Sequence, residues 1–303
     1  YDTAAAAAAA ADEQARKRRK QETGYETGAG GNGNAAPPVR QLFYVCADAE
    51  ERTASSSTYN GRKYSGSTYR SIGSGSIWLG DMLGGEWDEL LLINCKVDPT
   101  LLPLACPRLR LNHTVPVTLL YDGKMTDPQE MARLHKGGGF GCALLTAPVS
   151  AADNYGTHHS KINIAFYPTG VRVCVMTGNM CETDVEHKHN AAVVLDFPLL
   201  GYGGGGAGAG TRAQERDKDN NTDGDGDNDF GPYLREYLQA TARNVGDHDA
   251  KHRVLAAIQR LKLFDYSGAP LLVASVPGRK YSNHKERAQW GHWRLQKLLR
   301  ERG

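Results

Sequence analysis

The sequence predicts an α/β layered fold. Short apolar runs rich in Leu, Ile and Val recur along the chain, and turn-forming residues bound each of them, as they bound buried strands. Segments with helical spacing of apolar residues lie between these runs. Strands mixed with helices in this way are typical of layered α/β proteins. The 303 residues suffice for one large core or two modest domains.

Seven of the apolar runs are expected to form buried strands. The clearest pair is 162–167 and 171–177, which the sequence Pro-Thr-Gly joins as a hairpin. The expected strands are 89–94, 115–121, 141–147, 162–167, 171–177, 191–196 and 271–276. Another apolar run, at 39–47, precedes them.

Four segments are expected to form helices. The first has Asp127 as its N-cap, Pro128 at its first position and Gly137 just past its end. The other three are expected at 232–243, 251–264 and 289–302. The last of these carries its apolar residues on one side: Trp290, Trp293, Leu298 and Leu299.

Three low-complexity stretches are expected to lie outside the core. They are a disordered arm at 1–38 and insertions at about 49–76 and 201–231. The arm contains the basic run 16–20, which predicts a nuclear localisation signal, a phosphate-binding patch or a solvated charge run. The second insertion is rich in Asp and Gly, but a calcium loop is not expected, because Phe230 falls where the bidentate Glu should be.

Composition excludes several classes of protein. A net charge of +2 does not describe a generally basic nucleic-acid binder, so any polyanion site must come from local clustering. No apolar run reaches the ~18–20 residues of a membrane span. The start of the chain does not have the pattern of a secretory signal. The six cysteines contain no Cys-x-x-Cys, which favours buried reduced thiols over a disulfide framework or a zinc site.

The chain has one His-x-Lys, formed by His159 and Lys161 directly before the expected strand 162–167. Residues i and i+2 of a strand point to the same face, so the imidazole and the ammonium are expected side by side. Asn179 follows the second strand of the hairpin and is expected close to where the first strand begins. Three polar groups should therefore meet at one edge of a buried sheet, where α/β proteins often bind ligands.

These groups suit chemistry at a phosphorus atom. A neutral imidazole can attack phosphorus and form a covalent phosphohistidine. A lysine ammonium and an asparagine amide can bind the nonbridging oxygens. No carboxylate-rich cluster accompanies the set, so we expect no metal and no cofactor. The alternative is a structural histidine at a strand end, because His-x-Lys by itself is common.

Residues 156–180, which contain the His-x-Lys and the Asn, resemble the first signature of the tyrosyl-DNA phosphodiesterase family, a branch of the phospholipase D superfamily. Four more segments resemble the family in the correct order: 76–83, 117–124, 181–198 and 273–299. The resemblance implies a phospholipase D-like mixed β-sheet flanked by helices, the first of two pseudo-repeat domains, over residues 39–303.

The resemblance also implies roles for the three polar residues. His159 would be the nucleophile on the phosphorus of a 3′-phosphotyrosyl bond in DNA, and Lys161 and Asn179 would hold the phosphate oxygens. The wider superfamily carries an Asp after its His-x-Lys, and this branch has Asn in its place. The implied partner is DNA with a 3′-linked tyrosine or peptide, in DNA repair.

Four neighbouring positions carry DNA contacts in the family pattern. Tyr155 occupies the place of an aromatic residue that stacks on a base, although an ordinary half-buried aromatic is the alternative. Gly156 and Thr157 would lie along the DNA backbone. Asn190 stands where the family commonly has Gln.

The family builds its active site from two His-x-Lys motifs, and the second is not found in this chain. We therefore expect an N-terminal half that is inactive alone, with the C-terminal half as its partner. One alternative is a single-motif nuclease that pairs two His159 sites as a homodimer. Another is a non-catalytic DNA-binding half. The expected location is the nucleus, with the mitochondrion as the alternative.

Overall fold

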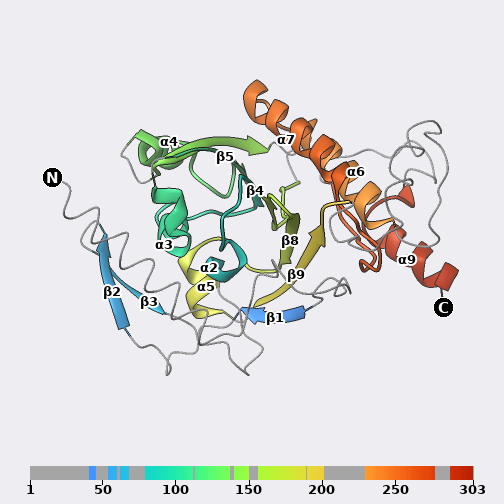
Figure 1. Cartoon of the computed structure of the whole chain (residues 1–303), viewed down its shortest axis with the longest axis horizontal. Coiled ribbons are helices and arrows are strands. Elements are labelled where there is room, and N and C mark those ends of the chain that lie inside the picture. The colour runs from blue at the N-terminus through green and yellow to red at the C-terminus, as the bar shows by residue number, and fades with distance from the viewer. Residues whose placement is uncertain are drawn as a thin grey trace, which may run out of the picture.

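The computed structural model describes residues 41–45, 54–59, 62–67, 79–111, 113–136, 140–149, 156–188, 190–200, 229–276 and 287–302. In these residues a central mixed sheet has helices on both faces (Figure 1), so the expected fold class is confirmed. The expected arm at 1–38, the expected helix end at Gly137 and residues 201–228 of the second insertion lie outside the described residues.

The main sheet has seven strands in the order β1-β9-β8-β7-β4-β5-β6. Their bounds are Gln41–Val45 (β1), Glu89–Asn94 (β4), His113–Asp122 (β5), Cys142–Val149 (β6), Ile162–Tyr167 (β7), Gly170–Met176 (β8) and Asn190–Pro198 (β9). Strands β4, β5 and β6 are parallel to one another and the other neighbours are antiparallel. The expected β7–β8 hairpin is confirmed.

A separate two-stranded sheet lies within the expected insertion at 49–76. It pairs β2 (Ala54–Tyr59) with β3 (Arg62–Ser67) in antiparallel register.

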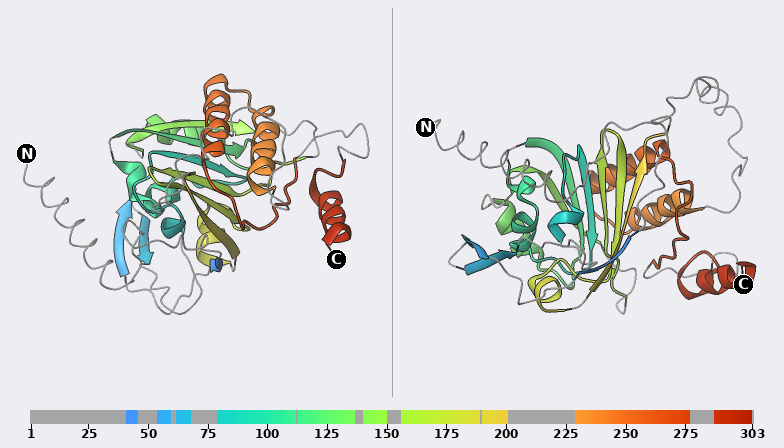
Figure 2. Two further views of the ribbon diagram at one scale, coloured as in Figure 1. Left: turned by 45° about the vertical axis from the view of Figure 1, so that its right-hand side comes forward. Right: turned by 60° about the horizontal axis from the view of Figure 1, so that its bottom comes forward.

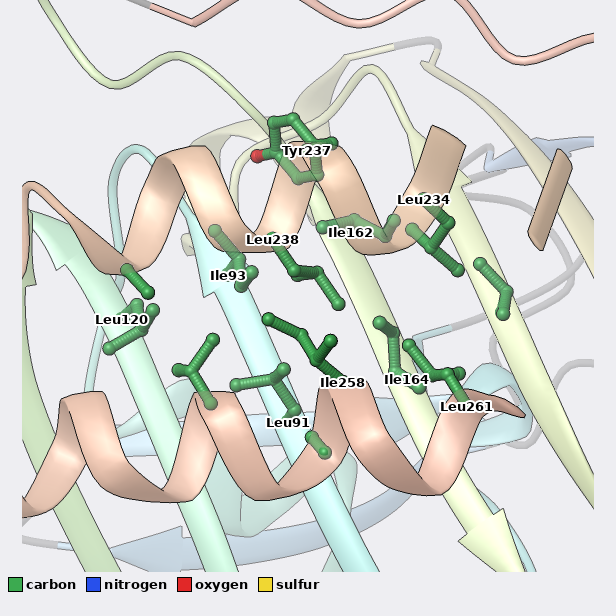
Figure 3. Packing of buried hydrophobic residues seen from close by; sticks show 14 of the residues in the cluster. Leu91, Ile93, Leu120, Ile162, Ile164, Leu234, Tyr237, Leu238, Ile258 and Leu261 are labelled. Carbon is green, nitrogen blue, oxygen red and sulfur yellow. The ribbon is translucent and has the colours of Figure 1, made fainter. Parts of the chain in front are cut away.

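Two long helices cover one face of the main sheet, α6 (Phe230–Ala242) and α7 (His248–Arg260) (Figure 2). Both carry the apolar spacing that the sequence showed, and Figure 3 shows their side chains packed against alternate residues of the strands. Leu91 and Ile93 of β4 belong to this core, whereas Leu90 and Leu92 belong to the core on the opposite face. Burial on both faces explains why residues 90–93 of β4 are all apolar.

Short helices cover the opposite face. They are α2 (Leu79–Met82), α3 (Leu101–Ala105), the 3₁₀ helix η1 (Pro107–Arg110), α4 (Pro128–Lys136) and α5 (Glu182–His187). The expected start of α4 is confirmed, because Asp127 Oδ1 accepts a hydrogen bond from the Gln129 N–H at 2.8 Å.

The expected strand at 271–276 is wrong. This segment pairs with none of the strands that the structure describes, and side chains of the neighbouring helices hold it instead. The Ala274 N–H donates to the Tyr233 hydroxyl at 3.1 Å, and Arg294 Nε donates to the Leu272 carbonyl at 2.8 Å. An apolar run of this length satisfies a strand pattern, but pairing needs a free sheet edge, which the local sequence does not specify.

The last helices are the 3₁₀ turn η3 (Leu261–Leu263) and α9 (Gly291–Arg302). The apolar residues that the sequence places on one side of the last helix differ in burial. Trp290, just before the helix, is 3 % exposed, but Trp293 and Leu299 are 40 % and 65 % exposed. Arg294 is buried in their place, with its guanidinium 3.6 Å from the centre of the Tyr233 ring. A charged side chain therefore anchors this helix.

Five of the six cysteines lie in the described residues, and all five are free thiols. Four of them are buried, as expected for this part of the chain, and Cys142 is half-buried. Cys46 lies outside the described residues. Of the helices that the structure describes, none has the length and apolar character needed to cross a membrane.

Candidate active site

The polar residues of the His-x-Lys hairpin lie at one edge of the main sheet. Strand β4 is parallel to β5 and antiparallel to β7, and β7 is antiparallel to β8. The ends of β4, β5 and β8 therefore meet the starts of β7 and β9 at the same edge. This arrangement places the loop after β4, the loop after β5 and the segment before β7 next to one another.

His159 and Lys161 are in contact directly before β7. The Lys161 Nζ lies 3.3 Å from each ring nitrogen of His159 and donates to the His159 carbonyl at 3.0 Å. The His159 side chain is exposed, whereas Lys161 is 5 % exposed. The structure thus places an accessible imidazole beside a buried ammonium; the i, i+2 spacing predicts that they are neighbours but not that they differ in exposure.

Burial has an electrostatic consequence for Lys161. Removal from water lowers the pKa of its ammonium below the ordinary value, while the nearby Cys95 and Asp184 side chains act in the opposite direction. A negatively charged group that reaches this ammonium would replace the lost solvation, so the site favours an anionic ligand such as a phosphate group.

Asn179 follows β8 and has both ends of its carboxamide fixed. Its Oδ1 accepts from the Lys96 N–H at 3.3 Å, and its Nδ2 donates to Asp184 Oδ2 at 2.7 Å. A backbone N–H only donates and a carboxylate only accepts, so these partners determine which end is oxygen. Among the described residues, the second N–H of Asn179 has no partner and is free to donate to a ligand.

Asn190, at the start of β9, supports the turn that carries Asn179. Its Nδ2 donates to the Asp184 carbonyl at 2.8 Å, and its Oδ1 accepts from Thr177 Oγ1 at 3.0 Å. A Cβ added at Gly178 would lie 2.9 Å from the Asn190 amide, so this close approach requires glycine. The hydrogen bonds of its side chain are made within the turn that carries Asn179, so Asn190 supports the site through this turn.

The three remaining expected positions lie just before His159. Thr157 is exposed, and the Gly156 carbonyl accepts from Lys124 Nζ at 3.1 Å. Tyr155, the expected stacking residue, lies outside the described residues. The exposure of Thr157 leaves room for a ligand that runs along this segment.

Three buried residues shape the site but were not predicted from the sequence: Asp122, His158 and Asp184. Asp122 Oδ2 accepts from the His158 N–H at 2.5 Å, and Asp122 Oδ1 accepts from the Lys124 N–H at 2.8 Å. The carboxylate therefore fixes the backbone beside His159. An Asp-Gly directly after an apolar strand was the available signal, but it also fits an ordinary turn.

His158 is 1 % exposed, and burial lowers its pKa to about 4. Neither of its ring nitrogens has a hydrogen-bond partner among the described residues. The two adjacent histidines thus differ in environment, and only His159 is accessible to a ligand. No group of three or more His, Cys, Asp and Glu side chains in the described part of the chain is placed to hold a metal ion.

Comparison with known proteins agrees with the sequence resemblance. A family model described as "Tyrosyl-DNA phosphodiesterase" matches residues 63–303. The chain belongs to the tyrosyl-DNA phosphodiesterase family. A curated Arabidopsis thaliana relative, tyrosyl-DNA phosphodiesterase 1, is 30% identical over 226 residues. The alignment covers 74% of this chain and 33% of the relative, so the chain spans about a third of the relative's length.

A solved structure shows the same fold. The crystal structure of the yeast tyrosyl-DNA phosphodiesterase matches with a TM-score of 0.52 and 13% sequence identity, over 86% of this chain and 49% of the yeast chain. Every site residue named above lies inside the span that the tyrosyl-DNA phosphodiesterase model matches. The residues that meet at the sheet edge therefore all belong to the part of the chain that matches the family.

Proposed function

We propose that this chain carries half of the active site of a phosphodiesterase that cleaves 3′-phosphotyrosyl linkages in DNA through a phosphohistidine. The observation that supports this most directly is the 3.3 Å contact between the exposed His159 imidazole and the buried Lys161 ammonium. This pair offers a nucleophile and a positive charge to one phosphoryl group. Family membership supports the choice of a tyrosyl-DNA substrate.

In the proposed first step, a ring nitrogen of neutral His159 attacks the phosphorus. The new N–P bond forms as the P–O bond to tyrosine breaks, and the tyrosine oxygen leaves with the electron pair. Lys161 and the free N–H of Asn179 bind the nonbridging oxygens, where negative charge is stabilised in the transition state. The imidazole proton passes to solvent once the phosphohistidine has formed.

A tyrosine oxygen leaves poorly unless it is protonated. We infer that a second His-x-Lys histidine, supplied by a part of the enzyme outside this sequence, protonates the tyrosine and later activates water. The chain contains one His-x-Lys and covers 33% of the Arabidopsis relative. Alone it should therefore bind the substrate with negligible turnover, and addition of the second half should restore turnover.

We also propose the contacts that would bind the DNA. Tyr155 would stack on a base, which adds about 1–3 kcal/mol and tolerates any base. Gly156 and Thr157 would lie along the backbone next to the scissile phosphate. No metal or cofactor is required in this scheme. The basic run at 16–20 supports a nuclear location, with mitochondrial DNA as the alternative.

An activated leaving group tests the proposal without the second half. An oligonucleotide with a 3′-(4-nitrophenyl phosphate) needs no general acid, because nitrophenolate is stable at pH 8. The chain should release up to one nitrophenolate per molecule in a burst and then stop, since nothing hydrolyses the phosphohistidine. His159→Ala should abolish the burst. His252→Ala, a change at an exposed histidine on α7, should leave it intact.

Three outcomes would contradict the proposal. A burst that persists in His159→Ala would remove His159 from the chemistry. The absence of any burst, although the oligonucleotide binds, would contradict nucleophilic attack. Repeated turnover of a 3′-phosphotyrosyl oligonucleotide by the chain alone would contradict the proposal that the chain holds only half of the active site. If light scattering then showed a dimer, such turnover would support the homodimeric nuclease instead.

A further inference from the structure

Asp184, in the first turn of α5, has the densest set of polar contacts at the site. It is 7 % exposed. Its Oδ2 accepts from both the N–H and the Nδ2 of Asn179, at 2.9 and 2.7 Å, and its Oδ1 accepts from Lys188 Nζ at 2.6 Å. A buried carboxylate with this many donors is held in one orientation.

The charge on this carboxylate is maintained in spite of burial. Burial alone would raise the pKa of Asp184, but hydrogen bonds from Lys188 and Asn179 outweigh that effect, so the pKa lies below the ordinary value. Asp184 is therefore an anion at neutral pH and remains an acceptor for Asn179. It also acts on the pKa of Lys161 in the direction opposite to burial.

The contacts of Asn179 determine what its amide can present to a ligand. Asp184 takes one of the two Nδ2 protons, and the Lys96 N–H occupies the carbonyl oxygen. One proton is left, and its direction follows from the planar amide. Without Asp184 only the 3.3 Å bond from the Lys96 N–H would hold the carboxamide, so its rotation would be less restricted and the remaining N–H would no longer be held in one direction.

We propose that Asp184 is a positioning residue of the candidate site, whose carboxylate fixes the Asn179 carboxamide so that one N–H is directed to a phosphate oxygen. This inference rests on the function proposed above. It assigns no contact between Asp184 and the substrate, because Asp184 acts through Asn179.

A general electrostatic role makes the opposite prediction. Removal of a carboxylate from a site for a phosphate would, through charge alone, strengthen the binding of DNA. A positioning role predicts weaker binding, because the amide donor is lost. The sign of the change in affinity therefore separates the two.

The binding experiment uses the full chain and a fluorescent single-stranded oligonucleotide that ends in 3′-phosphotyrosine, measured by fluorescence polarisation. Asp184→Asn should bind it about tenfold more weakly than the wild type. Asp196→Asn is the matched control. The Asp196 carboxylate lies 2.7 Å from Arg172 Nε and away from the sheet edge that carries the site. This variant should bind within twofold of the wild type.

A double-mutant cycle locates the effect. Asn179→Ala should also weaken binding, and Asp184→Asn should add no further loss in that background, because its effect requires the Asn179 amide. Equal losses in both backgrounds would overturn the proposal. So would Asp184→Asn binding as tightly as the wild type, or more tightly.

A second variant and a second readout keep the test independent of folding and of the proposed substrate. Asp184→Glu keeps the charge but moves the oxygens, so it should bind more weakly than the wild type, and equal binding would overturn the proposal. In ¹⁵N NMR spectra of the free chain, the signal of the hydrogen-bonded Asn179 Nδ2 proton should lie downfield and should shift in Asp184→Glu. An unchanged signal would contradict the positioning role.

The two readouts separate failure of the proposed function from failure of this inference. If the wild type binds a 3′-phosphotyrosine end no better than a 3′-hydroxyl end, the proposed function fails, while the NMR result still decides whether Asp184 positions the Asn179 amide.

Discussion

At the scale of single residues, the adjacent histidines at 158 and 159 show what the sequence can and cannot predict. The i, i+2 rule predicts that His159 and Lys161 share a side, and the 3.3 Å contact agrees. The backbone of the buried His158 is held by Asp122, which is 36 residues away in the sequence and accepts its N–H. No local sequence pattern contains that contact, so the burial of His158 could not be predicted from the sequence.

His158 should make the protein sensitive to acid. Its pKa falls from 6.5 to about 4 on folding, so the unfolded chain binds a proton that the folded chain excludes, and stability should decrease as pH falls from about 6.5 to 4. The shift corresponds to about 3 kcal/mol. Asp122 opposes the shift through its charge, while Lys161 and His159 reinforce it.

Urea unfolding at pH 7.5 and pH 4.5 measures this contribution. His158→Gln should lose about 2–3 kcal/mol less stability between these pH values than the wild type. His248→Gln, at a histidine whose side chain is 92% exposed, should behave as the wild type does. Equal losses for wild type and His158→Gln would show that His158 is charged in the folded protein or accessible to water.

At the scale of elements, the central strands were the most predictable part. The bounds expected for β4 and β7 agree with the structure, because each strand has a short, largely apolar centre that is buried on both faces and is flanked by polar residues or turns. The expected strand at 271–276 failed because an apolar run does not reveal whether a sheet edge is free. The short helices α2, α3 and α5 were missed, since a helix of one turn or two shows little periodicity.

The anchoring of α9 by Arg294 leads to a prediction at this scale. The guanidinium donates to the Leu272 carbonyl and to Asp229 Oδ2, at 2.8 and 2.6 Å, and lies over the Tyr233 ring. Arg294→Ala should lower the free energy of unfolding by about 2–3 kcal/mol, because these contacts are lost together. Arg300→Ala, at an exposed residue of the same helix, should change it by no more than about 0.5 kcal/mol.

Differential scanning calorimetry of the two variants checks this prediction. If Arg294→Ala unfolds at the wild-type temperature, Trp290 and the neighbouring apolar contacts hold α9 without the arginine. In that case the apolar contacts around Trp290 would be the anchor of this helix.

At the scale of the whole molecule, the order of the strands assembles the site. The hairpin of β7 and β8 was predictable from sequence and brings Asn179 back toward Lys161. The placement of β4 between β7 and β5 was not, because it depends on pairing between distant segments. That placement brings the Lys96 N–H to Asn179 and the Asp122 carboxylate to His158. The strand order thus places the groups that hydrogen-bond to Asn179 and to the backbone next to His159.

The proposed chemistry requires the imidazole of His159 to attack the phosphorus atom. The most direct measurement starts by reacting the chain with the oligonucleotide that carries a 3′-(4-nitrophenyl phosphate). The reaction is then stopped with alkali, in which phosphohistidine survives, and peptide mass spectrometry locates the bound nucleotide. The account predicts a single adduct on His159, in amounts equal to the nitrophenolate released. An adduct on any other residue, or released nitrophenolate with no adduct, would contradict it.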